Sequence, residues 1–198
     1  MQRAASMPGT TTPRSIPCRG TSWSEPKARS RYLASLVAKH AKPDAVVFEI
    51  GCNVGMNLKA LWDAGFRNLV GLELNPHAVE KFKVFYPEMA QSTTRVMVGS
   101  VEDTIPSFCD RQFDVVFTVR TLAHIHKESD WVMAEIARIA KDLLITIEVE
   151  EPQDWKHFSR NYQEIFERFG FRQVERPEAP AIPKMGLQTV VRVLRRPS

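Results

Sequence analysis

The sequence has few cysteines and no long apolar run, and these two absences exclude several classes of protein. Its three cysteines, Cys18, Cys52 and Cys109, are widely spaced and form no C-x-x-C pair. The sequence therefore encodes neither a disulfide framework nor a cysteine-based zinc site, and a reducing compartment fits best. No stretch approaches the roughly 18 apolar residues of a membrane span, since even residues 142–149 are short and carry charges. We expect a cytoplasmic protein with no membrane or metal partner.

Acidic residues are absent from the first part of the chain, which carries Arg3, Arg14 and Arg19. The formal net charge is +4, but residues 23–198 hold 24 basic and 23 acidic side chains. Enzymes that act on nucleic acids concentrate positive charge on the surface of the folded domain that contacts phosphates. Since the domain predicted here is almost neutral, we expect no nucleic-acid partner. Residues 1–22 have no apolar period and are predicted to be a disordered tail before one domain, residues 23–198. The tail also fits the loose description of an organellar transit peptide.

Helix-like and strand-like patterns alternate along the predicted domain. Short apolar runs predict strands at residues 45–50, 68–74, 95–98, 113–119, 142–149, 171–175 and 188–194. Helical spacing predicts helices at residues 27–41, 55–64, 101–108, 128–140 and 155–169, and another that Asn75 and Pro76 open. Because helices connect most strands, we expect an open, mostly parallel α/β sheet with helices on both faces. The last two strands lack a crossover helix, so the last strand is predicted to be antiparallel.

Small and acidic residues follow the first two predicted strands, where an open α/β sheet places its ligands. Glu49 precedes Gly51 and Gly55, two glycines on a strand-to-helix turn. Glu73 lies at the end of the second strand, where a carboxylate can accept hydrogen bonds from ribose hydroxyls. The G-x-G-x-x-G fingerprint of dinucleotide enzymes is broken, because Asn53 and a methionine replace two of its glycines. These residues therefore predict a nucleotide-type site that is not a dinucleotide site.

The order of these motifs resembles that of the class I S-adenosylmethionine-dependent methyltransferases over most of residues 45–195. The resemblance implies a Rossmann-like three-layer sandwich whose seven-stranded, mostly parallel sheet has an antiparallel last strand. It implies S-adenosylmethionine as cofactor and S-adenosylhomocysteine as product. By this resemblance Glu49 and the turn at residues 51–55 hold the methionine part, Glu73 holds the ribose, and residues 99–103 hold the adenine. The expected cofactor residues are Glu49, Gly51, Asn53, Gly55, Asn57, Glu73, Leu74, Ser100, Val101, Glu102 and Val119.

Two positions depart from the pattern of this family. Asn53 replaces the usual middle glycine, which is tolerable because asparagine visits left-handed backbone conformations more readily than most residues. Ser100 stands where an acid often contacts the adenine, so this contact falls to Glu102 or to the backbone of Val101. The variant motif at residues 49–58 is similar to that of small methylases in bacterial sugar, surface-polysaccharide or secondary-metabolite biosynthesis.

Side chains after the fourth and fifth predicted strands are candidates for a general base. His124 and His126 flank Ile125, and an unperturbed imidazole titrates near neutral pH. Glu148 could orient or deprotonate an amine or a hydroxyl, and His157 is a further candidate in the predicted helix 155–169. For the histidines the alternative is local packing or hydrogen bonding, and for Glu148 it is solvation. Cys52 is interpreted as a small residue in a tight turn, because no paired base accompanies the thiol.

Aromatic and basic residues are candidates for binding the methyl acceptor. Trp155, Arg160 and Tyr162 fall in one predicted helix, where Arg160 could face an anionic group. The alternative is an amphipathic helix whose aromatic residues face the core. Further candidates are Arg120, after the fourth strand, and Trp23, which with Arg29 and Arg31 could form a lid over the cofactor.

The sequence predicts methyl transfer to an oxygen or nitrogen atom of a small, anionic or sugar-like acceptor, by a monomer or homodimer. Two alternatives remain open: an RNA or protein methyltransferase, and a cofactor-binding partner subunit without activity of its own.

Overall fold

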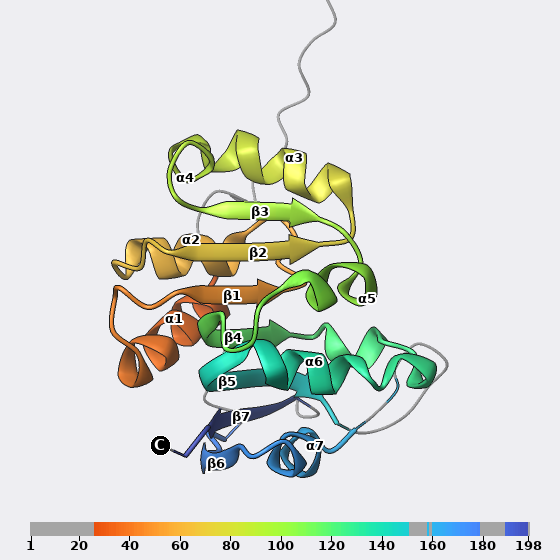
Figure 1. Ribbon diagram of the computed structural model, residues 1–198. Helices are drawn as coiled ribbons and strands as arrows, with labels where there is room; N and C mark the ends of the chain where they lie inside the picture. Colours follow the sequence, from red (N-terminus) through yellow and green to blue (C-terminus); the bar gives the residue numbers. More distant parts are fainter. Residues whose placement is uncertain (1–25, 151–157, 159, 179–188, 198) are drawn as a thin grey trace, which may run out of the picture.

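The structure is a computed structural model that describes residues 26–150, 158, 160–178 and 189–197 (Figure 1). These residues contain one seven-stranded sheet with the strand order β3-β2-β1-β4-β5-β7-β6. The strands are β1 (Val47–Ile50), β2 (Leu69–Glu73), β3 (Arg95–Val98), β4 (Phe113–Val119), β5 (Ala140–Val149), β6 (Arg172–Glu175) and β7 (Thr189–Arg195). The first five strands pair in parallel, whereas β7 is antiparallel to both β5 and β6. The predicted sheet, including its antiparallel last strand, is confirmed.

Helices cover both faces of this sheet. Side chains alternate between the two faces along a strand, so Val47 joins one buried apolar cluster and Phe48 joins the other. The first cluster includes residues of α1 (Ala28–His40), α2 (Met56–Asp63), α3 (Pro76–Phe85) and α4 (Pro87–Ala90). The second is packed by α6 (Val132–Ile139) and α7 (Tyr162–Arg168), and the short α5 (Val101–Thr104) lies against it. The fold is therefore a three-layer sandwich, as predicted.

Local sequence signals account for most of the helix boundaries. The Asn75 side chain accepts a hydrogen bond from the His77 amide at 3.0 Å and Pro76 occupies the first position of α3, as predicted. The predicted helix 155–169 was wrong at its start, because Phe158 and Arg160 are not helical and Asn161 caps α7 through the Glu164 amide. The pattern also missed α4, a single turn that begins at a proline.

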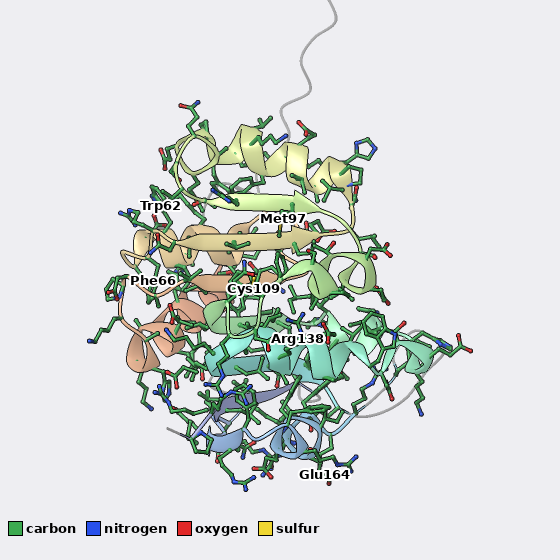
Figure 2. The ribbon with its side chains drawn as sticks, viewed as in Figure 1. Trp62, Phe66, Met97, Cys109, Arg138 and Glu164 are labelled. Atoms are coloured by element: carbon green, nitrogen blue, oxygen red, sulfur yellow. The ribbon has the colours of Figure 1, made fainter. Side chains whose placement is uncertain are left out.

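One side chain shows how the loops on the α6 face are fixed. Arg138, labelled in Figure 2, projects from α6 and donates hydrogen bonds to the Phe108 carbonyl at 2.8 Å and to Asp110 at 2.7 Å. These contacts tie α6 to the segment that leads into β4.

The strand order reverses between β1 and β4, and this reversal determines where a ligand can bind. From β1 the chain proceeds outward through β2 to β3, and then crosses to β4 on the other side of β1. The arrowheads of β1, β2 and β3 point to the same side in Figure 1. The loops after β1 and β4 therefore diverge at this edge and leave a crevice between them.

Candidate functional site

A cavity of about 660 Å³ opens at the carboxyl ends of β1, β2 and β4. Its walls come from the start of α1, the turn after β1, the ends of β2 and β3, and the loop after β4. Most of the predicted cofactor residues line it, namely Gly51, Asn53, Asn57, Glu73, Leu74, Ser100, Val101, Glu102 and Val119. Glu49 and Gly55 are buried next to the cavity.

The turn after β1 is left-handed at three alternating positions. Gly51, Asn53 and Gly55 have φ angles of 77°, 49° and 78°. A Cβ atom at position 51 would collide with the side chain of Thr121, and one at position 55 would collide with the ring of Phe82. Glycine is therefore required twice for both backbone conformation and space, whereas asparagine fits the middle position, as predicted.

Glu73 connects this turn to the end of β2. Its Oε2 atom accepts a hydrogen bond from the Asn53 amide at 2.8 Å, and its Oε1 atom accepts one from the Asn75 amide at 2.9 Å. A carboxylate offers about four acceptor positions, so about two remain for hydroxyl groups in the cavity. The side chain is thus fixed in place and still able to bind a ribose.

Glu49 is a fully buried carboxyl group. Its Oε1 atom accepts a hydrogen bond from Asn57 Nδ2 at 2.6 Å, and its Oε2 atom has no partner among the described residues. Burial raises the pKa of Glu49 to about 8, the charge of Glu73 adds to this rise, and Asn57 and Arg29 oppose it. The free protein therefore keeps this group largely protonated at neutral pH, and a nearby ligand cation would favour its charged form.

Cys52 is also buried, and its environment agrees with a structural role. A Cβ atom at Gly71 would lie only 2.8 Å from the Cys52 Sγ atom, so the thiol packs directly against the backbone of β2. Burial raises the pKa of the Cys52 thiol well above its usual value. A neutral thiol in such a position is a poor nucleophile.

The loop after β4 supplies the opposite wall of the cavity. Arg120 is exposed, has a φ angle of 55°, and is fixed by its amide, which donates to the Ile147 carbonyl at 2.8 Å. Within the described ranges, no hydrogen bond or ion pair engages the Arg120 side chain. A non-glycine residue in this conformation is uncommon and is often found at functional sites.

Two histidines from this loop line the cavity. The Nδ1 atom of His126 accepts a hydrogen bond from the Glu128 amide at 3.3 Å, and its ring contacts the ring of Phe158. The same Nδ1 atom lies 3.6 Å from the Glu128 Oε2 atom, so Nε2 is the ring nitrogen left for a ligand. His124 also lines the cavity, and its role as a general base stays a prediction.

Glu148 and Arg160 do not line the cavity. Their side chains form hydrogen bonds with the backbone of the loop after β4. The buried Glu148 Oε1 atom accepts hydrogen bonds from the amides of Thr121 at 3.0 Å and Leu122 at 3.2 Å. The buried Arg160 guanidinium donates to the carbonyls of Leu122, Ile125 and Phe158 at 2.8–3.1 Å, and its Nε atom donates to Asp130. These hydrogen bonds direct both groups to the loop, although the Glu148 Oε2 atom has no partner among the described residues. The predicted base at Glu148 and the acceptor contact at Arg160 stay predictions.

The remaining predicted residues are either buried elsewhere or not described. Tyr162, the first residue of α7, is fully buried in the apolar cluster that this helix packs against, so it does not reach the cavity. Trp23, Trp155 and His157 lie outside the described residues. Lys27 and Thr121 line the cavity but were not predicted as site residues: Lys27 belongs to no local motif, and for Thr121 the segment after the fourth strand drew attention only to His124.

Comparison with known proteins identifies this type of site. Residues 48–143 match the family described as a methyltransferase domain. This match supports an S-adenosylmethionine-dependent methyltransferase, with S-adenosylmethionine as the cofactor and S-adenosylhomocysteine as the product. The cavity fits S-adenosylmethionine, because the turn with Gly51 and Gly55 lets the backbone approach a ligand closely and the Glu73 carboxylate can still accept hydrogen bonds from a ribose.

Solved structures share the fold at low sequence identity. The Burkholderia thailandensis 1,6-didemethyltoxoflavin-N1-methyltransferase, with 1,6-didemethyltoxoflavin and S-adenosylhomocysteine bound, is 18% identical, with a TM-score of 0.69 over 86% of this chain and 79% of that chain. The magnesium protoporphyrin IX methyltransferase from Synechocystis PCC 6803 is 14% identical, with a TM-score of 0.67 over 85% and 82%. A methyltransferase in complex with the Haloferax volcanii Trm112 activator is 18% identical, with a TM-score of 0.67 over 86% and 91%.

Among the described residues, no helix has the length and apolarity to cross a membrane. The same residues contain no cluster of three or more histidine, cysteine, aspartate or glutamate side chains suited to a metal ion.

The buried Glu49 should make the stability of the cofactor-free protein depend on pH. Its pKa is raised from 4.5 to about 8, so between these values the unfolded chain is ionised while the folded protein retains the proton. Stability should therefore fall as pH rises across this range. Between pH 6 and pH 8, Glu49→Gln should gain about 2 kcal/mol of unfolding free energy relative to wild type, measured by urea denaturation. Parallel stability curves for the two proteins would contradict the buried, protonated carboxyl group.

Removing the Glu73 carboxylate should weaken cofactor binding. Glu73→Ala should lose about 1.5–3 kcal/mol of binding free energy for S-adenosylhomocysteine, measured by calorimetry, because charged hydrogen bonds to the ribose are lost. Glu80→Ala is the charge-matched control, since Glu80 lies on the exposed face of α3 and pairs with Lys83. Unchanged affinity in a folded Glu73→Ala protein would show that the ribose binds elsewhere.

Proposed function

We propose that the protein transfers the methyl group of S-adenosylmethionine to an oxygen or nitrogen atom of a small acceptor that carries an anionic group. The observation that carries this proposal is Arg120, which lines the cavity and whose side chain has no hydrogen bond or ion pair among the described residues. His126 adds a further hydrogen-bond donor to the same cavity. A carboxylate or a phosphate would satisfy this set of donors.

Acidic side chains and the loop after β4 lie on different sides of the cavity. Glu73 and Glu102 project from the β2 and β3 side, and we assign this side to the ribose and the adenine. Arg120, His124 and His126 come from the loop after β4, and we assign this side to the acceptor. The reacting atoms would then meet near the end of β1, between the two sides.

Methyl transfer from S-adenosylmethionine depends more on the positioning of the reactants than on covalent catalysis by the protein. The cofactor supplies a methyl group already activated on a sulfonium. The protein must hold the acceptor atom in line with it, and such orientation contributes several kcal/mol to lowering the barrier. We propose that His124 accepts the proton of an acceptor hydroxyl or ammonium group, since its imidazole lies at the acceptor side. Arg120 and His126 would hold the anionic group.

Two observations favour a small acceptor over a macromolecule. Outside residues 1–22 the chain has nearly equal numbers of acidic and basic residues, so a broad basic surface for nucleic acid is not expected. The cavity of about 660 Å³ is also within the usual size range of small-molecule sites. The similar Burkholderia structure, whose bound molecule is 1,6-didemethyltoxoflavin, supports the same choice.

Substitution of Arg120 tests this proposal with pairs of acceptors. Sugar, amine and phenol acceptors would be screened as acids and as their neutral amides or esters, with S-adenosylhomocysteine formation as the readout. We expect turnover of the acids, and a loss of about 10- to 100-fold in kcat/KM in Arg120→Ala that is confined to them. Arg120→Lys should restore part of the loss, and Arg95→Ala, which removes an exposed arginine of the edge strand β3, should have no effect.

Three other outcomes would contradict the proposal. An equal loss for acids and neutral analogues would mean that Arg120 only shapes the loop. Cofactor binding without turnover of any small acceptor would favour a partner subunit without activity of its own. Methylation of RNA or protein substrates alone would favour a macromolecular methyltransferase.

A further inference from the structure

Thr121 is a polar residue in the wall of the cavity. It is the N-cap of the short 3₁₀ helix η2 (Leu122–His124), a position where a threonine oxygen usually accepts a hydrogen bond from an amide of the helix. Among the described residues, its side chain makes no such bond. The Thr121 hydroxyl donates instead to the Val119 carbonyl at 3.3 Å, which is long for a hydroxyl donor. Because its proton is directed there, the Thr121 oxygen keeps its capacity as an acceptor.

A carboxyl group takes over the capping that Thr121 does not provide. The Glu148 Oε1 atom accepts hydrogen bonds from the amides of Thr121 at 3.0 Å and Leu122 at 3.2 Å. These bonds fix the backbone of Thr121 from a residue that does not itself line the cavity. The start of η2 is therefore held without the threonine oxygen, which is left for a ligand.

The side chain of Thr121 lies against the turn after β1. A Cβ atom at Gly51 would collide with both Oγ1 and Cγ2 of Thr121, so the hydroxyl packs directly over the backbone of Gly51. Gly51 lines the same cavity and belongs to the turn expected to hold the methionine part of the cofactor. The Thr121 hydroxyl is therefore at the junction of the cofactor side and the acceptor side, where the reacting atoms would meet.

We propose that Thr121 Oγ1 accepts a hydrogen bond from an N–H group of the reacting acceptor atom, and that the methylated group is therefore an amine. This inference rests on the proposed function and chooses between the nitrogen and oxygen acceptors that it leaves open. A neutral primary or secondary amine presents its lone pair to the methyl carbon and still keeps an N–H group for Thr121. A hydroxyl acceptor has a single proton and gives it up when it is methylated, so it cannot keep this bond.

The transfer step balances without a further reactant. In its proposed role, His124 takes one proton from the ammonium form of the acceptor. The nitrogen lone pair then forms a bond to the methyl carbon while the electron pair of the carbon–sulfur bond returns to sulfur, which gives S-adenosylhomocysteine and a methylated ammonium product. Positive charge develops on the nitrogen, so its N–H group becomes a stronger donor to Thr121 as the reaction proceeds. An interaction that strengthens in the transition state raises kcat.

A cofactor analogue tests this contact without knowledge of the acceptor. Sinefungin carries an amino group on the carbon that replaces the methylated sulfur, so it presents N–H donors where the transferred methyl group would lie. S-Adenosylhomocysteine has no group at this position. Both ligands would be titrated by calorimetry into the wild-type protein, Thr121→Val, which removes the hydroxyl, and Thr121→Ser, which keeps it. Thr104→Val is the matched control, because Thr104 also packs its hydroxyl against a glycine, Gly99, but does not line the cavity.

The inference predicts a selective loss. Thr121→Val should bind sinefungin about 10- to 100-fold more weakly, the range expected when a hydrogen bond to a charged group is removed, and should bind S-adenosylhomocysteine within about threefold of wild type. Thr121→Ser should keep most of the affinity for sinefungin, and Thr104→Val should behave as wild type with both ligands. With an amine acceptor, Thr121→Val should lower kcat by the same range and leave KM within about threefold.

Contrary outcomes are distinct from a failure of the proposed function. Equal weakening of both ligands in folded Thr121→Val would show that the side chain only shapes the turn, and no weakening of either would show that the methyl position lies away from it. Turnover of hydroxyl acceptors alone would also overturn the inference, although the enzyme would still methylate small acceptors. A selective loss of sinefungin would uphold the Thr121 contact even if every acceptor in the screen failed. A wild-type protein that binds neither ligand would overturn both proposals.

Discussion

The close approach of the turn after β1 to its neighbours is the constraint on which the site depends. The backbone at Gly51 passes so near Thr121 of the loop after β4 that no side chain fits between them. The same turn is held from the other side by Glu73, whose carboxylate accepts hydrogen bonds from the amides of Asn53 and Asn75. Three strand ends are thus fixed relative to one another, and the cavity is the space that their loops leave between them.

Buried charged groups fix the acceptor side of this space in a different way. Glu148 accepts hydrogen bonds from two amides at the start of the loop after β4, and Arg160 donates to carbonyls further along it. Backbone amides are donors and carbonyls are acceptors, so one carboxyl group and one guanidinium group together can satisfy an irregular loop that forms no strand. Such a loop can hold Arg120 in a left-handed conformation that an unsupported chain would rarely adopt.

The sequence predicted those parts of the structure that depend on residues close to one another along the chain. Strand patterns and the Asn75 cap are short-range signals, and the left-handed Asn53 follows from its place between two glycines. The acceptor side depends on contacts between distant residues, which no local pattern contains. Glu148 and Arg160 look like available polar groups in the sequence, but they contact backbone atoms 26 to 38 residues away. The same applies to the start of α7, where tertiary hydrogen bonds replace the helix that the pattern predicted.

The charge of the bound cofactor explains why the acceptor side of the cavity should favour an anion. The sulfonium is positive, and Arg120 already places a second positive charge at the same cavity without a counter-ion among the described residues. Glu73 accepts hydrogen bonds from two amides on the cofactor side, and Glu148 accepts hydrogen bonds from amides of the loop, and neither is paired with the guanidinium. Like charges repel more strongly in a partly enclosed site than in water. An acceptor with a carboxylate or a phosphate would relieve this repulsion as it binds, so its binding and that of the cofactor would favour each other. A neutral acceptor would leave the repulsion in place, and the same site would bind it less well.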